Sequence, residues 1–302
     1  MKLGRRKFLA GSLATLGAGI LGAQTDCQPQ NKITFYQPYD SLMLGNTGIK
    51  VSRLCMGTGM KGWMRQSNHT RLGEKKFMDL IQAAYDRGIR VFDLADLYGT
   101  HQYVAKALKG IDRDKYVLIS KIWWRNNGLP EKERPDADIM VNRFCKELDT
   151  DYIDVMLMHC VVSGDWPNEL RRQMDILAKL KEKNIIGAHG VSCHSLDALK
   201  AAVNEPWVDS VNARINPYGI KMDGPAEEVA PVLRQLHDAG KGVVGMKLIG
   251  EGSYRDSDEK RDHSVKYVLE LGCVDVLNVG FENTQEIDDF AARVRKVPTK
   301  TT

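Results

Sequence analysis

The sequence predicts an α/β fold, a single-domain (β/α)8 barrel with an N-terminal hairpin lid. From residue 51 onward, short apolar runs alternate with segments of helical periodicity. Strict alternation of this kind is typical of a parallel sheet, and eight such units are the number that closes a barrel. No linker or internal repeat divides the chain after residue 42. We therefore expect one barrel domain over residues 42–297.

The apolar runs are short and often β-branched, as in strands that are buried on both faces. The predicted strands are Val51–Gly57, Arg90–Asp96, Tyr116–Ile122, Ile153–Cys160, Gly187–Cys193, Ser210–Ile215, Gly242–Leu248 and Val274–Phe281. The predicted helices are Glu74–Arg87, His101–Leu108, Ala137–Leu148, Asn168–Lys183, Leu196–Val203, Glu227–Ala239, His263–Leu271 and Gln285–Val294. Ser195 and Thr284 are the predicted N-caps of two of them. Residues 42–50, with an Asn-Thr-Gly turn, predict the hairpin that covers the bottom of the barrel.

A doubly wound sheet is the rival architecture, and it would carry a phosphate-binding fingerprint after its first strand. The stretch Met56–Gly62 is rich in glycine, but it lacks the GxGxxG spacing and no helix follows at once. This stretch therefore favours the barrel.

The net charge of +4 lies in the first segment of the chain. Residues 1–23 hold four basic residues and no acidic one, so the remainder carries equal numbers of each. A remainder with no net charge offers no general attraction to nucleic acid or to anionic lipid. We expect neither as a partner.

Residues 4–9 read Gly-Arg-Arg-Lys-Phe-Leu, and an apolar run follows from Phe8 to Ala23. This pattern resembles a twin-arginine signal peptide, which is exported by the twin-arginine machinery. The run is shorter than the roughly 20 residues of a membrane span. We expect export, to the periplasm, with no stable span after processing of residues 1–23. Residues 24–41 would be a linker and residues 298–302 a tail.

The six cysteines show no CxxC motif and no paired Cys/His spacing, so we expect no metal site. The even count permits disulfides, but Cys55, Cys160 and Cys193 lie in apolar strand-like runs, so we expect buried thiols. Cys27 could accept a lipid, but Asp26 before it departs from a lipidation motif. We therefore expect no lipid anchor.

Polar residues at the carboxyl ends of the strands predict the active site, because barrel enzymes place their chemistry there. Asp93, Tyr98, Lys121 and His159 come from three adjacent strand ends. A lysine can lower the pKa of a tyrosine toward that of a useful general acid, and a carboxylate can hold the lysine charged. A neutral histidine can orient a carbonyl group. This set suits protonation of a carbonyl oxygen as it gains negative charge.

The stretch from Gly88 to Gly99, Gly-Ile-Arg-Val-Phe-Asp-Leu-Ala-Asp-Leu-Tyr-Gly, resembles the signature of the aldo-keto reductases. Ser120-Lys121, Met158-His159 and Gly190-Val191-Ser192 follow in the family's order, and the similarity spans residues 42–297. The resemblance implies hydride transfer from NADP or NAD to an aldehyde or ketone. It makes Tyr98 the proton donor, tuned by Lys121 and Asp93, with His159 orienting the carbonyl.

The same resemblance implies a set of cofactor-binding residues. Ser192 and Asn212 would bond the nicotinamide amide, residues 246–248 would run along the cofactor, and Gly280 would begin the loop at the adenosine end. The full set is Gly57, Thr58, Ser192, Cys193, Asn212, Met246, Lys247, Leu248, Gly280 and Asn283. Cys193 departs from the family pattern, which has an asparagine at this position.

The loop after the eighth strand is the largest departure from the family pattern. Glu286 stands where a basic residue is usual and Phe290 where an asparagine is usual, and no Lys or Arg occurs from residue 280 to 292. Acidic side chains repel a 2′-phosphate and can bond ribose hydroxyls. We therefore expect weak selectivity for NADP, with NAD tolerated or preferred.

The expected substrate is a small carbonyl compound or a sugar derivative. Two alternatives remain open at this point. The departures at Cys193, Glu286 and Phe290 favour a non-redox binding or sensor protein on the same barrel. A lyase or isomerase could instead use Tyr98 and Lys121 as acid and base.

Overall fold

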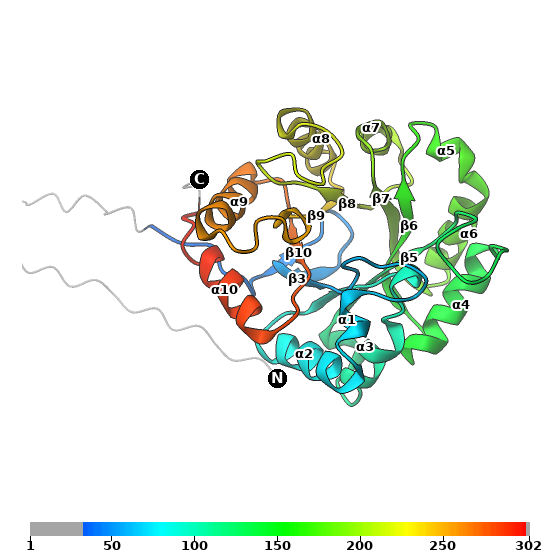
Figure 1. Cartoon of the computed structure of the whole chain (residues 1–302). Helices are drawn as coiled ribbons and strands as arrows, with labels where there is room; N and C mark the ends of the chain where they lie inside the picture. Colours follow the sequence, from blue (N-terminus) through cyan, green and yellow to red (C-terminus); the bar gives the residue numbers. More distant parts are fainter. Residues whose placement is uncertain (1–32, 300–302) are drawn as a thin grey trace, which may run out of the picture. The chain divides into compact units, whose positions relative to one another are not determined.

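The computed structural model describes residues 33–299, in which eight parallel strands close into a barrel in the order β10-β3-β4-β5-β6-β7-β8-β9. The strands are β3 (Leu54–Gly57), β4 (Val91–Asp93), β5 (Val117–Ile122), β6 (Ile153–Val161), β7 (Ile186–Cys193), β8 (Ser210–Arg214), β9 (Gly242–Met246) and β10 (Val276–Val279). Figure 1 shows the helices surrounding these strands. The predicted (β/α)8 barrel is confirmed. The predicted signal peptide, Cys27 and the first half of the predicted linker (residues 24–32) lie outside the described residues.

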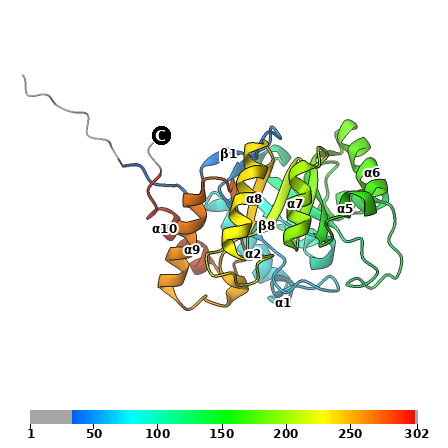
Figure 2. The same cartoon turned by 90° about the horizontal axis from the view of Figure 1, so that it is seen from above.

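An antiparallel hairpin, β1 (Ser41–Met43) with β2 (Lys50–Ser52), precedes the barrel. Figure 2 places it at one end of the barrel, opposite the short helix α1. Leu44 in its turn is fully buried and packs into the apolar cluster inside the barrel. The predicted hairpin is thus confirmed, but the predicted strand 51–57 is wrong as one unit. It breaks at Arg53, whose N–H turns away to the carbonyl of Asp40.

The barrel interior is filled in layers that follow from the two-residue period of a strand. Its lower layers are apolar and include Val91, Ile119 and Leu157. Two residues further along the same strands, the same face carries Asp93, Lys121 and His159. A buried polar layer therefore lies directly above a tightly filled apolar one.

Helices cover the outside of the barrel through a second, larger apolar cluster. They are α2 (Glu74–Asp86), α3 (His101–Ala107), α4 (Ala137–Leu148), α6 (Arg171–Glu182), α7 (Leu196–Asn204), α8 (Ala226–Asp238), α9 (Asp258–Leu271) and α10 (Thr284–Val294). Shorter pieces are α1 (Asn68–Arg71), α5 (Trp166–Glu169), η1 (Asp96–Tyr98), η2 (Arg113–Lys115) and η3 (Gly250–Gly252). None of the helices within residues 33–299 is both long and apolar enough to cross a membrane.

Three predicted helix boundaries are wrong. The predicted helix 168–183 is broken at Leu170, whose backbone is not helical, so that α5 and α6 are separate. Helix α9 begins five residues early, because Ser257 caps it ahead of a charged first turn that shows no apolar period. The N-cap of α10 is Asn283, not Thr284: its side chain accepts a hydrogen bond from the N–H of Glu286.

Candidate active site

A buried ion pair forms the centre of the polar layer. Lys121 Nζ lies 2.6 Å from Asp93 Oδ1 and donates a second hydrogen bond to the carbonyl of Leu94. Asn212 Nδ2 donates to the same carboxylate oxygen at 3.0 Å. The side chains of the pair are 1% and 5% exposed. Such a pair is held only where hydrogen bonds replace the lost water, as they do here.

Tyr98 lies above this pair in η1, and glycines fix its ring. A Cβ on Gly59 would come within 2.2 Å of the ring, and one on Gly62 within 2.5 Å. Gly99, which ends η1, has φ +68° and presses against the carbonyl of Arg65, where no side chain could fit. The glycine-rich stretch after β3 therefore packs against a tyrosine.

The four predicted catalytic side chains meet at the mouth of the barrel. The Tyr98 hydroxyl lies 3.3 Å from His159 Nε2, and Lys121 Nζ lies 5.1 Å from the centre of the Tyr98 ring. With the Asp93–Lys121 pair, these contacts join all four residues. The sequence placed them at neighbouring strand ends, and the structure brings them together.

The protonation states differ in part from those expected. Burial first, and Asp93 second, raise the pKa of Tyr98 well above its usual value. The expectation that Lys121 lowers this pKa is wrong for the structure, because the ammonium is bonded to Asp93 and Leu94 rather than to the phenol oxygen. Burial and Lys121 lower the pKa of His159 well below its usual value, so this imidazole is neutral, as expected. Burial and Arg214 lower the pKa of His194 to about 2.

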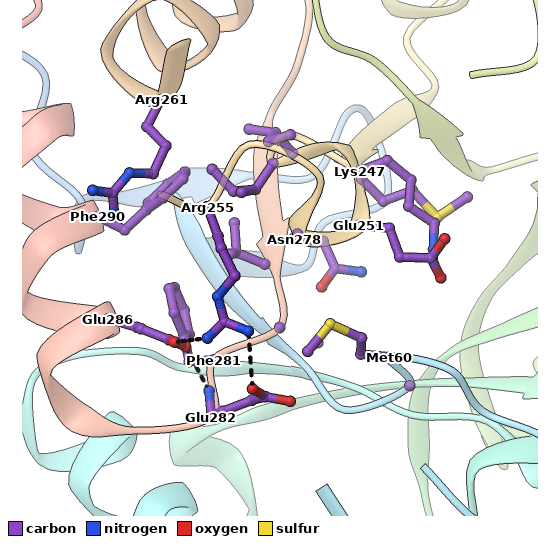
Figure 3. Close-up of a pocket in the computed structure, with 18 of the residues that line it drawn as sticks. Met60, Lys247, Glu251, Arg255, Arg261, Asn278, Phe281, Glu282, Glu286 and Phe290 are labelled. Carbon is purple, nitrogen blue, oxygen red and sulfur yellow. Dashed lines mark hydrogen bonds and ion pairs between the residues drawn. The ribbon is translucent and has the colours of Figure 1, made fainter. Parts of the chain in front are cut away.

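A groove of about 500 Å³ runs from Tyr98 and Asp93 toward α9 and α10. Five predicted cofactor residues line it, namely Gly57, Met246, Lys247, Leu248 and Gly280. Figure 3 shows that its far end lies between the loop after β9 and the start of α10. The groove thus joins the predicted catalytic residues to the loop after β9 and to α10, and a concave site of this size suits a small-molecule ligand.

The other predicted cofactor residues lie away from the groove wall. Thr58 is buried, and its hydroxyl donates to the carbonyl of Asp93. Cys193 is buried in the apolar cluster outside the barrel. Asn283 is exposed and caps α10. Ser192 and Asn212 pair in register on β7 and β8, in the buried polar layer.

Two arginines at the far end of the groove were missed by the sequence reasoning. Arg255 Nη2 lies 2.8 Å from Glu286 Oε1, and Arg261 Nη1 lies 2.9 Å from Asp289 Oδ2. Both line the groove together with those carboxylates (Figure 3). They come from the loop after β9 and from α9, and no motif signals them. Their positive charges offset part of the acidic character that the sequence predicts for this end.

The residues present fit a nicotinamide dinucleotide. Within the described chain no protein group bonds Asn212 Oδ1, which is buried in the polar layer. A carboxamide N–H₂ is a donor that would satisfy this oxygen, and the Ser192 hydroxyl on the neighbouring strand could bond the same amide. Further along, Gly57 and Gly280 line the groove without side chains of their own.

We predict that Asp93→Asn lowers the free energy of unfolding by about 3–5 kcal/mol, because it leaves the buried Lys121 ammonium without a counter-charge. Urea denaturation followed by circular dichroism measures this. Asp79→Asn is the matched control, since Asp79 pairs with Lys75 on an exposed helix face and should cost less than about 1 kcal/mol. Equal effects of the two substitutions would show that the buried pair is not a structural constraint.

Comparison with known proteins identifies the family. The aldo/keto reductase family matches residues 53–294. The chain is 29% identical over 218 residues to "Probable aldo-keto reductase 1" of Glycine max, covering 70% of this chain and 60% of that protein. It is 27% identical over 241 residues to aldo-keto reductase YhdN of Bacillus subtilis, covering 74% of this chain and 69% of that protein. In fold it is similar to the holo form of an aldo-keto reductase from Bacillus halodurans, with a TM-score of 0.66 and 20% identity over 87% of this chain and 92% of the other. The chain belongs to the aldo/keto reductase family.

Proposed function

We propose that this protein is an exported oxidoreductase that transfers hydride from a nicotinamide cofactor to an aldehyde or ketone, with Tyr98 as the proton donor. The observation that carries the proposal is the contact of the Tyr98 hydroxyl with His159, above the Asp93–Lys121 pair, at the end of the groove. Family membership supports the same class of reaction.

Tyr98 is suited to donate a proton. Its raised pKa keeps the hydroxyl protonated at neutral pH, so the donor form is the one present. A carbonyl oxygen that gains negative charge is a much stronger base than the carbonyl itself, and it can draw this proton. The Tyr98 ring packs closely against the backbone of Gly59, which restricts its movement at the mouth of the barrel.

His159 and Lys121 act on the same oxygen in different ways. The neutral imidazole of His159 lies within hydrogen-bond distance of the Tyr98 hydroxyl and can bond a carbonyl oxygen that arrives beside it. The Lys121 ammonium is fixed 5.1 Å from the Tyr98 ring centre, and its charge favours a developing oxyanion in this water-poor layer. Asp93 keeps the ammonium in place.

A nicotinamide cofactor, when bound, supplies the hydride. Ser192 and Asn212 would hold its amide, Met246, Lys247 and Leu248 would line its length, and Gly280 would lie toward its adenosine end. The substrate would approach beside His159, where Trp123 packs edge-on against the imidazole and Trp63 packs against Trp123. Trp63 is 48% exposed, and its face suits the apolar face of a sugar ring or another small carbonyl compound.

A lyase or isomerase that uses Tyr98 as acid and Lys121 as base is disfavoured, because Lys121 Nζ already donates to Asp93 and to the carbonyl of Leu94 and has no free role as a base. The unpartnered Asn212 oxygen and the open groove argue against a barrel that has lost its cofactor. Both observations favour the reductase.

We predict that Tyr98→Phe lowers kcat for carbonyl reduction by about 10²–10⁴-fold, because the general acid is removed. Cofactor affinity and the melting temperature should stay close to wild type. Stopped-flow and steady-state absorbance of the reduced nicotinamide measure the loss. Tyr103→Phe on α3, which packs against Phe77, is the control and should retain full activity. Undiminished turnover in Tyr98→Phe would refute the role of this hydroxyl.

Cofactor selectivity follows from the charges at the far end of the groove. We propose that NAD is tolerated or preferred over NADP, because both arginines there are already matched by carboxylates. Arg255 bonds Glu286 and approaches Glu282 at 3.5 Å, while Arg261 bonds Asp289. A 2′-phosphate must displace a carboxylate from a guanidinium before it gains a partner.

We predict that Glu286→Gln shifts the ratio of dissociation constants toward NADPH by roughly tenfold, because it removes one negative charge and frees Arg255. Quenching of tryptophan fluorescence by NADPH and by NADH measures both constants. Glu74→Gln, on an exposed pair with Lys106, is the matched control and should leave the ratio unchanged. Wild-type protein that binds NADPH tens of times more tightly than NADH would contradict the proposal.

We propose that residues 1–23 direct export through the twin-arginine pathway, on the basis of Arg5-Arg6 and the short apolar run that follows. Replacing both arginines by lysine should leave the full-length protein in the cytoplasm, whereas replacing Lys2 by Gln should not. Cell fractionation and immunoblotting in a bacterial host give the answer. Equal export of the double variant would rule out the twin-arginine route.

A further inference from the structure

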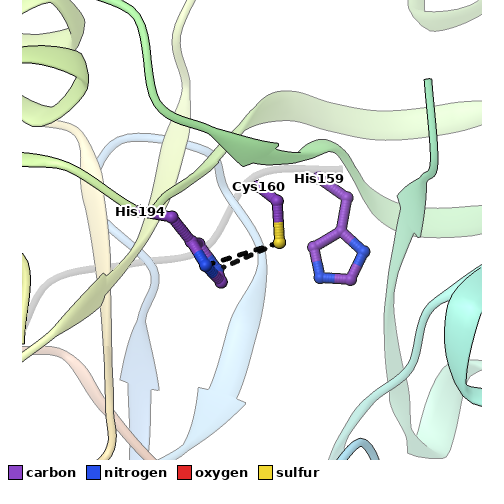
Figure 4. Close-up of side chains that lie close together, drawn as sticks. All are labelled: His159, Cys160 and His194. Atoms are coloured by element: carbon purple, nitrogen blue, oxygen red, sulfur yellow. Dashed lines mark hydrogen bonds between the residues drawn. The ribbon is translucent and has the colours of Figure 1, made fainter. Parts of the chain in front are cut away.

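Three side chains with strong affinity for soft metal ions meet beside the proposed active site. His159 and Cys160 lie near the carboxyl end of β6, just before Val161, and His194 follows β7. Each offers one ligand atom, and these atoms all lie within 4.8 Å of one another. Cys160 Sγ is 3.4 Å from both ring nitrogens of His194, and Figure 4 shows the thiol between the two imidazoles.

An irregular strand end produces this cluster. Adjacent residues of a regular strand point to opposite faces, so His159 and Cys160 would be separated. Here the pairing register of β6 with β7 shifts between Met158 and Val161, and Cys160 has φ +57°. A non-glycine residue in this conformation costs free energy and persists only where its surroundings hold it. The carbonyl of His159 accepts a hydrogen bond from the Trp124 side chain, and that of Cys160 accepts one from Arg125. These bonds stabilise the irregular backbone.

We propose that His159, Cys160 and His194 form a binding site for one thiophilic metal ion of the zinc class. Two imidazoles and a thiolate are a typical ligand set for such an ion, with a fourth position left open at the mouth. Cys160 binds as the thiolate, and its proton leaves to solvent. Cys160 and His194 are partly exposed, which gives an ion a way in.

Burial raises the pKa of Cys160 to about 11, so its proton leaves only when an ion binds, and nearby cations favour the thiolate that then forms. Of the cations near it, Lys121, Lys247 and Arg214 are each paired with a carboxylate. Arg125 has no ion pair among residues 33–299, and a thiolate at position 160 would offset its charge. The thiolate that forms on binding therefore lies beside a guanidinium that lacks a carboxylate partner in the described chain.

An ion can bind His194 only if Arg214 first releases this imidazole and bonds another acceptor. Its guanidinium donates to His194 Nδ1, the lone pair that an ion would need. The carboxylate of Asp223 lies 3.2 Å from Arg214 Nη1, and its oxygens have no hydrogen bond within the described chain. Arg214 can therefore turn fully to Asp223. Ser192 Oγ, 3.5 Å from His194 Nε2, can then accept the remaining N–H, as groups behind metal-bound histidines do.

The ion and the reaction would share His159. This part of the inference rests on the proposed function. An ion that holds the imidazole prevents it from turning to a carbonyl oxygen, so filling the site should inhibit carbonyl reduction. The protein would then respond to thiophilic ions through its own active-site histidine.

The test uses the full chain, stripped of metal by a chelator and kept reduced by a phosphine. Equilibrium dialysis against zinc should give one ion per chain, and Cys160→Ser and His194→Gln should each weaken binding at least about tenfold. Cys145→Ser, which removes a thiol on α4, is the matched control and should bind as wild type does. Cobalt(II) should give a thiolate-to-metal absorption band with the wild-type protein. This band should be lost in Cys160→Ser and kept in Cys145→Ser. Melting temperatures confirm that the variants fold.

Zinc binding that is unchanged in Cys160→Ser and in His194→Gln, or cobalt binding without a thiolate band, would overturn the site. Zinc should lower the rate of aldehyde reduction by wild type over the concentration range in which it binds, and His194→Gln should resist it. Zinc that binds at the cluster without slowing reduction would overturn the link to His159. If no carbonyl compound is reduced with NADH or NADPH, the proposed function fails, while dialysis and cobalt spectra still decide the site.

Discussion

The ion pair between Asp93 and Lys121 is the constraint on which the mouth of the barrel depends. Removing two charges from water costs several kcal/mol for each, and the pair is stable only because its geometry and further bonds compensate. Lys121 has two acceptors, and Asp93 Oδ1 receives both the ammonium and Asn212. If either charged side chain moved, the other would be left as an unpaired buried charge. The pair therefore fixes the position of the ammonium relative to the Tyr98 ring, and the tightly filled apolar layer below supports it.

The barrel and its four central residues could be predicted from sequence for one physical reason. Parallel strands all end on the same side of a sheet, so polar residues that follow successive strands must gather. Asp93, Lys121 and His159 also occupy the same phase of the two-residue period as the apolar residues below them. Tyr98 was harder, since it follows its strand by several residues. The family resemblance identified it, and the neighbouring glycines show how it is held in place.

The features that sequence reasoning missed depend on contacts between distant segments or on irregular backbone. Arg255 and Arg261 reach the groove because the loop after β9 folds back toward α10, and no periodic pattern records the path of a loop. Cys160 was expected to be a buried thiol because it lies in an apolar run, and the alternation of a regular strand would separate it from His159. The register shift that joins them is set by the side chains of Trp124 and Arg125, which belong to another strand's loop.

Nearly all of the cations around the groove and the mouth of the barrel are already paired with a carboxylate. Lys121 holds Asp93, Lys247 holds Glu251, and Arg255 holds Glu286. A ligand that enters such a site gains little from charge alone, because each new ion pair replaces an existing one. Discrimination then comes from how easily a given pair opens and from whether the released group finds another partner. Exposed pairs at the far end of the groove open at small cost, whereas the buried pair at the mouth does not. Substitutions at the far end of the groove should therefore change ligand selectivity, whereas the buried pair at the mouth keeps the catalytic geometry constant.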